Sequence, residues 1–469
     1  MILAIPLDTE ASAPLYEQIY SYIKNEIRNG GLHYKDRLPS ARGLAQALQI
    51  SRNTVDLAYD QLASEGYIES VPRSGYYVCR IGNLTHLNAE RIVPARSVLS
   101  RDETYRYDFN PFAIDIANFP YSVWRKISRN CLSGENHELF LSGDWQGDRN
   151  FREAIAKYLH ASRGVSCTAD TIVIGAGTGY LLQLLAQLLR PREGIGRIAF
   201  ENPTYIKAYR TFQRFGYEAK GIPVDAEGIS LRELIASGAS IAYVTPSHQY
   251  PLGTIMTVRR RTDLLAWAAE EPDRYIIEDD HDSEFRYKGK PIPSLQGMDS
   301  ANRVIYLGTF SRAVTPAIRA GYMVLPPELL KRYRAEFAYS STVSRFDQAI
   351  LTEFITQGHF ERHVNKMRTI YKAKHDCLQK ALKRFGNDIR VTGEHAGLHL
   401  VVEFLKEPSE EELIEKAEKA GIRLFGLNAH YIEKPENSVP TLLIGFANLT
   451  EEEITSGIHR LYDLISAKE

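Results

Sequence analysis

The most informative segment of this chain is Tyr275-Ile-Ile-Glu-Asp-Asp-His-Asp-Ser-Glu-Phe285. It begins with a short apolar run typical of a buried strand and continues into acids where that strand would end. Similar apolar runs recur from Tyr107 onward, with helix-like segments between most of them: 171–174, 197–200, 241–245 and 304–307. This alternation predicts an α/β body, with a mainly parallel sheet and helices on both of its faces.

The end of the chain predicts a smaller α/β subdomain within the same body. Long helical segments at about 328–385 lead into an apolar run at 397–404, an acidic helix after Ser409 and a last apolar run at 441–446. Residues 81–106 show no periodicity, which is typical of a linker. We therefore expect one body at 107–469, preceded by a linker at 81–106.

Residues 1–80 predict a separate winged helix-turn-helix. Apolar residues repeat at helical spacing from Leu15 to Ile27, and Ser40 and Ser51 are each placed to cap a further helix. Two short β-rich runs then flank Pro72-Arg-Ser-Gly75, which is a hairpin signal. Three helices followed by a hairpin describe this fold.

The second helix of a helix-turn-helix enters the major groove of DNA and contacts it through residues near its N-terminus. In this chain that helix would begin at Ser51-Arg-Asn-Thr54. The alternative is a protein-interaction module, because eight Lys and Arg against nine Asp and Glu do not make residues 1–80 basic. The expected DNA contacts are Lys35, Arg37, Arg42, Arg52, Asn53, Thr54 and Arg73.

Composition excludes several classes of protein. Of the 469 residues 44% are hydrophobic, and 57 Lys and Arg nearly balance 58 Asp and Glu, so wholesale disorder and a strongly basic overall charge are excluded. The four cysteines contain no C-x-x-C pair, which excludes a disulfide framework and a thiolate zinc site. The uncharged stretch 171–189 is better explained by a strand, a glycine turn and a helix than by a membrane span. We expect a cytoplasmic protein with no membrane partner and no signal peptide.

Several segments of the body predict a site for a phosphorylated pyridine cofactor. The turn Gly175-Ala-Gly-Thr178 joins a strand to a helix, where backbone N–H groups can approach a phosphate. Thr309, Ser311 and Arg319 offer two hydroxyls and a guanidinium to a dianion. Alone, the glycine turn is a weak signal because many such turns bind nothing, and the second segment is equally compatible with an ordinary polar loop.

The acidic run after the strand at 275–278 allows three interpretations. Asp279, at the carboxyl end of the strand, can pair with a protonated pyridine nitrogen. The four residues 279–282 can instead bind a divalent metal, or they can form a solvated loop. Tyr205 follows another strand and offers an aromatic face for ring stacking, although a tyrosine is more often part of the core.

The first part of the chain closely resembles the GntR-type winged-helix signature. The matching segments are Leu38-Pro-Ser-x-Arg42, Ser51-Arg-Asn-Thr-Val55, Leu62-x-x-Glu-Gly-Tyr-Ile68 and Gly75-Tyr-Tyr-Val78. Arg42, Arg52 and the wing-tip Gly75 sit at the family's usual DNA-contact positions. The resemblance favours DNA binding over the interaction module.

The body resembles fold-type I aminotransferases, and the two parts joined resemble the MocR/GabR family of transcription regulators along nearly the whole chain. The segments that carry this resemblance are Thr245-Pro-Ser-His-Gln249, Ile277-Glu-Asp-Asp280 and Gly308-Thr-Phe-Ser311. The resemblance implies operator DNA as a partner and a head-to-tail homodimer. It also implies that pyridoxal 5'-phosphate is held by Tyr205 stacked on the ring, Asp279 at the ring nitrogen, and Gly177, Thr178, Thr309, Ser311 and Arg319 around the phosphate and edge.

The sequence departs from this family at three places. The Schiff-base lysine would follow Gly-Thr-Phe-Ser, where Arg312 stands, and a guanidinium stays protonated with a delocalised lone pair. Position 281, commonly a tyrosine that donates to the cofactor, is His281, which could still donate, so His281 and Arg312 stay among the expected cofactor contacts. The family's carboxylate-binding arginine is missing near His430, which leaves His430 and Lys207 as the candidate effector contacts.

The preferred hypothesis is a transcription regulator whose aminotransferase-like body senses a small metabolite. Because Arg312 cannot form a Schiff base, pyridoxal 5'-phosphate is expected to bind non-covalently or not at all, and transaminase activity is not expected. One alternative is a working aminotransferase with a DNA-binding appendage. Another is a metal-dependent sensor built on residues 279–282.

Overall fold

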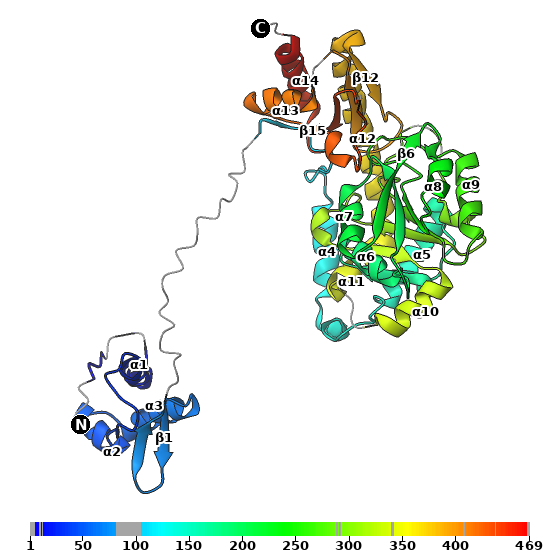
Figure 1. Ribbon diagram of the computed structural model, residues 1–469. Helices are drawn as coiled ribbons and strands as arrows, with labels where there is room; N and C mark the ends of the chain where they lie inside the picture. Colours follow the sequence, from blue (N-terminus) through cyan, green and yellow to red (C-terminus); the bar gives the residue numbers. More distant parts are fainter. Residues whose placement is uncertain are drawn as a thin grey trace. The chain divides into compact units, whose positions relative to one another are not determined.

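The computed structural model describes residues 5–8, 11, 13–80, 105–287, 289, 292–338, 342–406, 409–436 and 438–466. The chain divides into two compact units, Met1–Glu103 and Thr104–Glu469 (Figure 1). Of the predicted linker at 81–106, all but residues 105 and 106 lie outside the described residues.

The smaller unit is a winged helix-turn-helix, as predicted. Ser40 Oγ accepts a hydrogen bond from the Gly43 backbone N–H at 3.1 Å, and Ser51 Oγ accepts one from the Thr54 N–H at 3.2 Å. Both serines therefore cap helices. The apolar helix faces and the hairpin share one core. The elements are α1 (Leu15–Arg28), α2 (Ala41–Leu48), α3 (Arg52–Ser64), β1 (Ile68–Val71) and β2 (Gly75–Val78), with β1 and β2 antiparallel.

The larger unit is built on an 8-stranded sheet with the order β4-β11-β10-β9-β8-β5-β6-β7. Neighbouring strands from β10 to β6 are parallel, whereas β11 runs antiparallel to both β10 and β4, and β7 runs antiparallel to β6. The strands are β4 (Ile172–Gly175), β5 (Arg197–Asn202), β6 (Glu218–Asp225), β7 (Gly228–Ile229), β8 (Ile241–Val244), β9 (Tyr275–Asp279), β10 (Val304–Thr309) and β11 (Gly321–Val324).

Helices cover both faces of this sheet, because successive strand residues point to opposite sides and both sides are apolar (Figure 1). One face packs against α6 (Thr178–Leu188), α7 (Ile206–Arg214) and α10 (Pro327–Glu336). The other packs against α4 (Tyr121–Cys131), α5 (Arg149–Arg163), α8 (Leu231–Ala236), α9 (Val258–Ala269), α11 (Arg345–Thr356) and the first half of α12 (His359–Leu382).

The C-terminal subdomain packs a second sheet against the rest of α12. This sheet has the order β12-β13-β16-β15, and α13 and α14 complete its core. The bounds are β12 (Ile389–Thr392), β13 (His399–Phe404), α13 (Glu410–Lys419), β15 (Phe425–Gly426), β16 (Thr441–Gly445) and α14 (Glu451–Ser466). A separate parallel pair joins β3 (Tyr107–Asp108) to β14 (Ile422–Arg423). Short 3-10 helices lie at Gly134–Phe140, Ala169–Thr171, Gln296–Met298, Pro316–Ile318, Lys383–Asp388 and Asn428–His430.

The predicted strand runs at 171–174, 197–200, 241–245, 275–278 and 304–307 are all strands of the large sheet. The antiparallel β11 lies outside those predicted runs, because Gly-Tyr-Met-Val is too short and too mixed to stand out without its neighbours. No helix among the described residues is long and apolar enough to cross a membrane.

Candidate functional site

The carboxyl ends of the central strands bring the predicted cofactor residues to one edge of the large sheet. Thr309 of β10 pairs with Gly321 of β11, which pairs with Gly175 of β4. Asp279 ends β9 and pairs with Leu307 of β10. Thr309, Gly321 and Gly175 therefore share one row across adjacent strands, and Asp279 lies opposite a residue two positions before Thr309, at the edge where ligands of open α/β sheets bind.

The glycine turn before α6 lies against Arg319. Gly177 has a φ of +80°, and a Cβ there would be 2.8 Å from Arg319 Nη2, so only glycine lets the arginine approach this closely. Arg319 Nη2 donates to the Ala176 carbonyl at 3.1 Å. Thr178 is the first residue of α6, so the free N–H groups of this helix start beside a guanidinium. Both features favour an anion.

The hydroxyls of Thr309 and Ser311 contact each other. Thr309 Oγ1 donates to Ser311 Oγ at 2.9 Å, and the Ser311 backbone N–H donates to Thr309 Oγ1 at 3.2 Å. Both side chains are half-buried at the end of β10, beside the row that holds Gly175. The two hydroxyls and Arg319 are thus placed by neighbouring strands.

Asp279 accepts a hydrogen bond from Tyr243, whose ring is buried. Burial raises the pKa of Asp279 to about 6, and the Tyr243 hydrogen bond offsets part of that rise. Burial also raises the pKa of Tyr205, and the charge of Asp279 adds to this effect while Arg319 opposes it. Tyr205, Asp279 and Arg319 therefore share one electrostatic environment.

Arg312 is held by a buried ion pair. Its Nε donates to Asp282 Oδ1 at 2.9 Å and its Nη2 to Asp282 Oδ2 at 3.0 Å, and Nη2 also donates to the Pro111 carbonyl at 2.8 Å. The two side chains are 11% and 0% exposed. Burial alone would raise the pKa of Asp282, but the guanidinium outweighs this and holds it well below its usual range. Arg312 Nη1 is buried with no hydrogen-bond partner among the described residues.

Histidines surround Tyr250 close to this pair. The ring of His281 lies 4.8 Å from that of Tyr250, and the ring of His430 lies 5.2 Å from it. His248 lies parallel to His281 with ring centroids 6.3 Å apart, and His399 lies 6.0 Å from Tyr250. Burial lowers the pKa of all four histidines to about 4, so the rings are neutral at neutral pH.

The two candidate effector contacts have different surroundings. His430 is buried, with Nε2 3.5 Å from the Tyr250 hydroxyl and Nδ1 lacking a partner among the described residues. Lys207 is exposed on α7, and within the described part of the chain its ammonium makes no hydrogen bond or ion pair. Only His430 is brought next to Tyr250.

The acids at 279–282 do not gather around one point. Asp280 accepts from Arg163 at 2.9 and 3.0 Å and also from Tyr306 and Ser283, so its carboxylate is held by these three side chains. Asp279 is bonded to Tyr243 instead. The four-residue metal cluster considered from the sequence is therefore not formed.

The predicted DNA contacts lie on the surface of the smaller unit. Lys35, Arg37, Arg42, Arg52, Asn53 and Arg73 are exposed, while Thr54 and Gly75 are half-buried. Arg52 Nε lies 3.2 Å from Asp56 Oδ2 on the same helix. Arg42 and Arg73 have no carboxylate partner within residues 5–80 as described, so their charges are available to phosphates.

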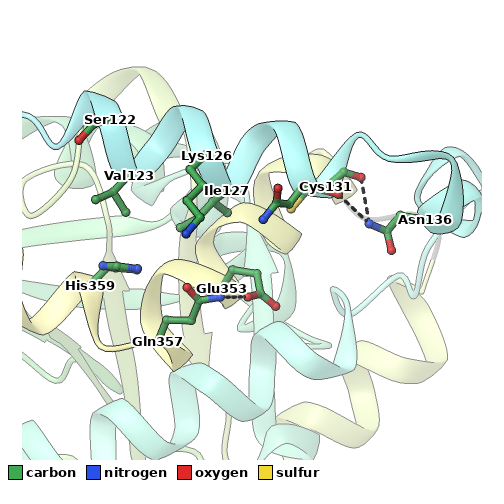
Figure 2. A pocket seen from close by; sticks show the side chains of 10 residues that line it. Ser122, Val123, Lys126, Ile127, Cys131, Asn136, Glu353, Gln357 and His359 are labelled. Atoms are coloured by element: carbon green, nitrogen blue, oxygen red, sulfur yellow. Dashed lines mark hydrogen bonds between the residues drawn. The ribbon is translucent and has the colours of Figure 1, made fainter.

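A groove of about 600 Å³ between α4, α11 and the start of α12 contains none of the predicted site residues (Figure 2). Gln357 donates to Glu353 across one wall, and Asn136 Nδ2 donates to the Cys131 carbonyl at 3.3 Å at the other end. The residues predicted from the sequence to bind a cofactor lie instead at the carboxyl edge of the large sheet.

Sequence reasoning missed three residues of this edge: His248, Tyr250 and the role of Asp282 as partner of Arg312. The first two follow β8, whose predicted run ends in Thr245-Pro-Ser-His-Gln-Tyr250. The position of polar residues directly after a parallel strand was the available signal. Their partners come from loops elsewhere in the chain, which no local pattern indicates.

The site fits a phosphorylated pyridine in part. The glycine turn with its Arg319 contact, the Thr309 and Ser311 hydroxyls and the buried Asp279 suit a phosphate and a ring nitrogen. Covalent attachment does not fit, because Arg312 has no amine and is committed to Asp282 and the Pro111 carbonyl.

Comparison with known families covers both units. The model of aminotransferase class I and II matches residues 114–461, and that of the bacterial regulatory proteins of the gntR family matches residues 15–78. The structure of a Pyrococcus horikoshii kynurenine aminotransferase superposes with a TM-score of 0.69 at 25% identity, covering 82% of this chain and 96% of the other.

Relatives match this chain over both of its parts. The chain is 41% identical over 458 residues to the uncharacterized HTH-type transcriptional regulator YdeL of Bacillus subtilis strain 168, and the match covers 97% of both chains. It is 32% identical to the probable rhizopine catabolism regulatory protein MocR of Rhizobium meliloti, over 99% of this chain and 96% of that protein. The chain therefore belongs to the MocR/GabR-type transcription regulators, in which a GntR winged helix precedes an aminotransferase-like domain.

Proposed function

We propose that this regulator senses a small metabolite through its aminotransferase-like body and holds pyridoxal 5'-phosphate, when it binds, without a covalent bond. The observation that carries the proposal is the state of Arg312. Its guanidinium occupies the position of the family's Schiff-base lysine and forks onto a buried carboxylate. Such a group recognises anions and cannot act as an amine nucleophile.

The remaining residues at the carboxyl edge of the large sheet support binding of the cofactor. Gly177, Thr178 and Arg319 would hold the phosphate with Thr309 and Ser311, because they combine a helix start, a guanidinium and two hydroxyls. Asp279 would accept the proton of the ring nitrogen, and Tyr205 would lie on the ring. When bound, the cofactor would supply an aldehyde that reacts reversibly with amines.

An effector changes DNA binding only if it binds one conformation better than another. We propose that the body dimerises head to tail, that His281 and Arg312 contact the cofactor, and that the effector contacts His430 and Lys207. Lys35, Arg37, Arg42, Arg52, Asn53, Thr54, Arg73 and Gly75 would meet operator DNA, since the basic ones are all exposed. Fluorescence anisotropy with the upstream region of its own gene, at low salt, tests DNA binding; absence of binding there would contradict the proposal.

Borohydride trapping tests the non-covalent mode. The unmodified protein should lose added pyridoxal 5'-phosphate on dialysis and carry no adduct after reduction. The Arg312→Lys variant should retain the cofactor and carry one reducible adduct per chain at that position, detected by mass spectrometry, since it regains a neutralisable amine. The double variant Arg312→Lys/Arg319→Ala is the matched control, and it should lose most of the adduct.

Two outcomes would contradict this proposal. A reducible adduct on the unmodified protein, together with turnover of amino donors into keto products, would establish an aminotransferase with a DNA-binding appendage. No binding by either protein would show that the edge no longer accepts the cofactor.

A further inference from the structure

We propose that His248, His281 and Asp282 form a binding site for one divalent transition-metal ion of the zinc class. The site does not depend on the proposed binding of pyridoxal 5'-phosphate, and it uses neither Asp279 nor Asp280. One ligand atom from each residue can be chosen so that all lie within 4.8 Å of one another. Two imidazoles and one carboxylate are a donor set that zinc and neighbouring metals accept.

The nitrogens of this site lack partners. Both ring nitrogens of His248 and Nδ1 of His281 are buried and make no hydrogen bond among the described residues. His248 is only 2% exposed. A buried polar atom without a partner costs about 1–3 kcal/mol, and one ion would satisfy one nitrogen of each ring, so these rings indicate that a group outside the chain binds between them.

The backbone fixes the position of His248. Gly397 has a φ of +85°, and a Cβ there would lie 2.3 Å from His248 Cε1, so the ring packs directly on this glycine. Gly253 faces the same ring, with its Cβ position 3.3 Å from Nε2. The ring therefore has little room to turn away from His281.

Asp282 can bind a metal while it holds Arg312. Its Oδ2 lies 3.7 Å from His281 Nδ1 and accepts one hydrogen bond from Arg312. A carboxylate oxygen has a second acceptor position, and carboxylates that bind metals are commonly oriented by such a hydrogen bond. Bond lengths of about 2.1 Å place tetrahedral ligand atoms about 3.4 Å apart, so a pair at the 4.8 Å limit would have to close by about 1.4 Å.

The surroundings provide an entry path and an open coordination position. The His281 side chain is 20% exposed, whereas that of Asp282 is fully buried, so an ion would enter past the His281 ring. With three protein ligands, the fourth position of a tetrahedral ion would hold water or an anionic ligand. The site would thereby supply a second way to bind a carboxylate metabolite next to Tyr250 and Arg312.

The test uses untagged full-length protein, freed of metal with a chelator and studied without pyridoxal 5'-phosphate. Co²⁺ should bind at one equivalent per chain with the visible absorption of a four-coordinate site, and Zn²⁺ should displace it. Isothermal titration of Zn²⁺ then measures the affinity of each variant. Because neither readout involves the cofactor or DNA, failure of this site is distinguishable from failure of the proposed function.

His281→Phe and Asp282→Asn should each weaken Zn²⁺ binding at least 10- to 100-fold, roughly the loss seen when even an orienting partner is removed. His281→Phe is the decisive variant, because its position is only half-buried and the phenyl ring keeps the shape. The control is His375→Phe, since His375 is another buried histidine with an unpartnered nitrogen and one carboxylate neighbour. No stoichiometric binding, or equal binding by all the variants, would overturn the proposal.

Discussion

At position 312 the chain keeps a positive charge and lacks a nucleophile. A guanidinium spreads its lone pair over a plane, so it cannot attack a carbonyl, but that plane matches a carboxylate at two points. Arg312 and Asp282 use this match inside the protein, where each group separately would be costly to bury. Asp282 also adopts a φ of +54°, which places its carboxylate toward the arginine within a tight turn.

Removal of one partner of this pair should destabilise the larger unit strongly. We expect Asp282→Ala to lower its free energy of unfolding by about 3–5 kcal/mol, because Arg312 is left buried without a counter-charge. The double variant Asp282→Ala/Arg312→Met should recover much of that loss in urea unfolding. Arg149→Ala removes two exposed ion pairs, with Glu153 and Asp170, as a control and should cost less than about 1 kcal/mol for each. A small loss for Asp282→Ala would show that water replaces the carboxylate.

His430 should make the larger unit less stable in acid. Burial lowers its pKa from the ordinary 6.5 to about 4, so the folded protein binds fewer protons than the unfolded chain between these values. Stability from this group is complete above pH 6.5 and is lost as the pH falls toward 4. Relative to His430→Phe, the unmodified protein should lose up to about 1.4 kcal/mol per pH unit in this window. Urea unfolding between pH 4.5 and 7 measures the difference, and parallel curves would contradict it.

At the scale of elements, the turn between β4 and α6 is the most demanding connection of the candidate site. Its glycine has a positive φ and leaves room for a guanidinium, while the next helix begins within one residue. Because this turn needs glycines directly after a buried strand, the sequence pattern of a short apolar run followed by glycines predicted it.

Gly177→Ala should weaken both folding and anion binding. A methyl group there meets Arg319 Nη2 at 2.8 Å and forces a left-handed backbone on alanine, so we expect a loss of about 1–3 kcal/mol in stability. Affinity for pyridoxal 5'-phosphate should fall along with it. Gly179→Ala is the matched control, because it lies inside α6 with nothing within 4 Å, and it should be neutral or stabilising by up to about 1 kcal/mol. Equal effects of the two changes would contradict this.

The sequence predicted those features of the fold that depend on residues close together in the chain. The caps at Ser40 and Ser51, the hairpin and the buried strands depend on neighbouring residues and were predicted. The antiparallel β11 and the contacts of Arg312 were not, because each depends on a partner far along the chain. Pro111 contacts Arg312 across 201 positions, and no spacing rule relates the two.

At the scale of the whole molecule, the overall charge of −1 means that DNA must be attracted by a local surface. We expect the exposed basic side chains of the smaller unit to form that surface without making the unit basic overall. Each phosphate contact releases condensed counterions, so binding should depend steeply on salt.

Arg42→Ala should reduce this salt dependence. Arg42 is exposed at the start of α2, and if it meets one phosphate, its loss should lower the slope of log affinity against log salt by about 0.9. Anisotropy titrations of the full chain between low and moderate salt measure the slope. Arg149→Ala removes the same charge from the larger unit as a control and should leave the slope unchanged. An unchanged slope for Arg42→Ala would show that Arg42 does not contact the DNA phosphates.

The first described residues of the larger unit are fastened to its C-terminal sheet. Arg106 and Tyr107 N–H groups donate to the Gly421 carbonyl at 2.9 and 3.2 Å, β3 then pairs with β14, and the Gly445 N–H donates to the Phe109 carbonyl at 3.0 Å. A force applied to the chain on the amino-terminal side of Arg106 would therefore act on the subdomain that contains His399 and His430. Through this anchorage, any tilt of that subdomain would carry residues 106–109 with it.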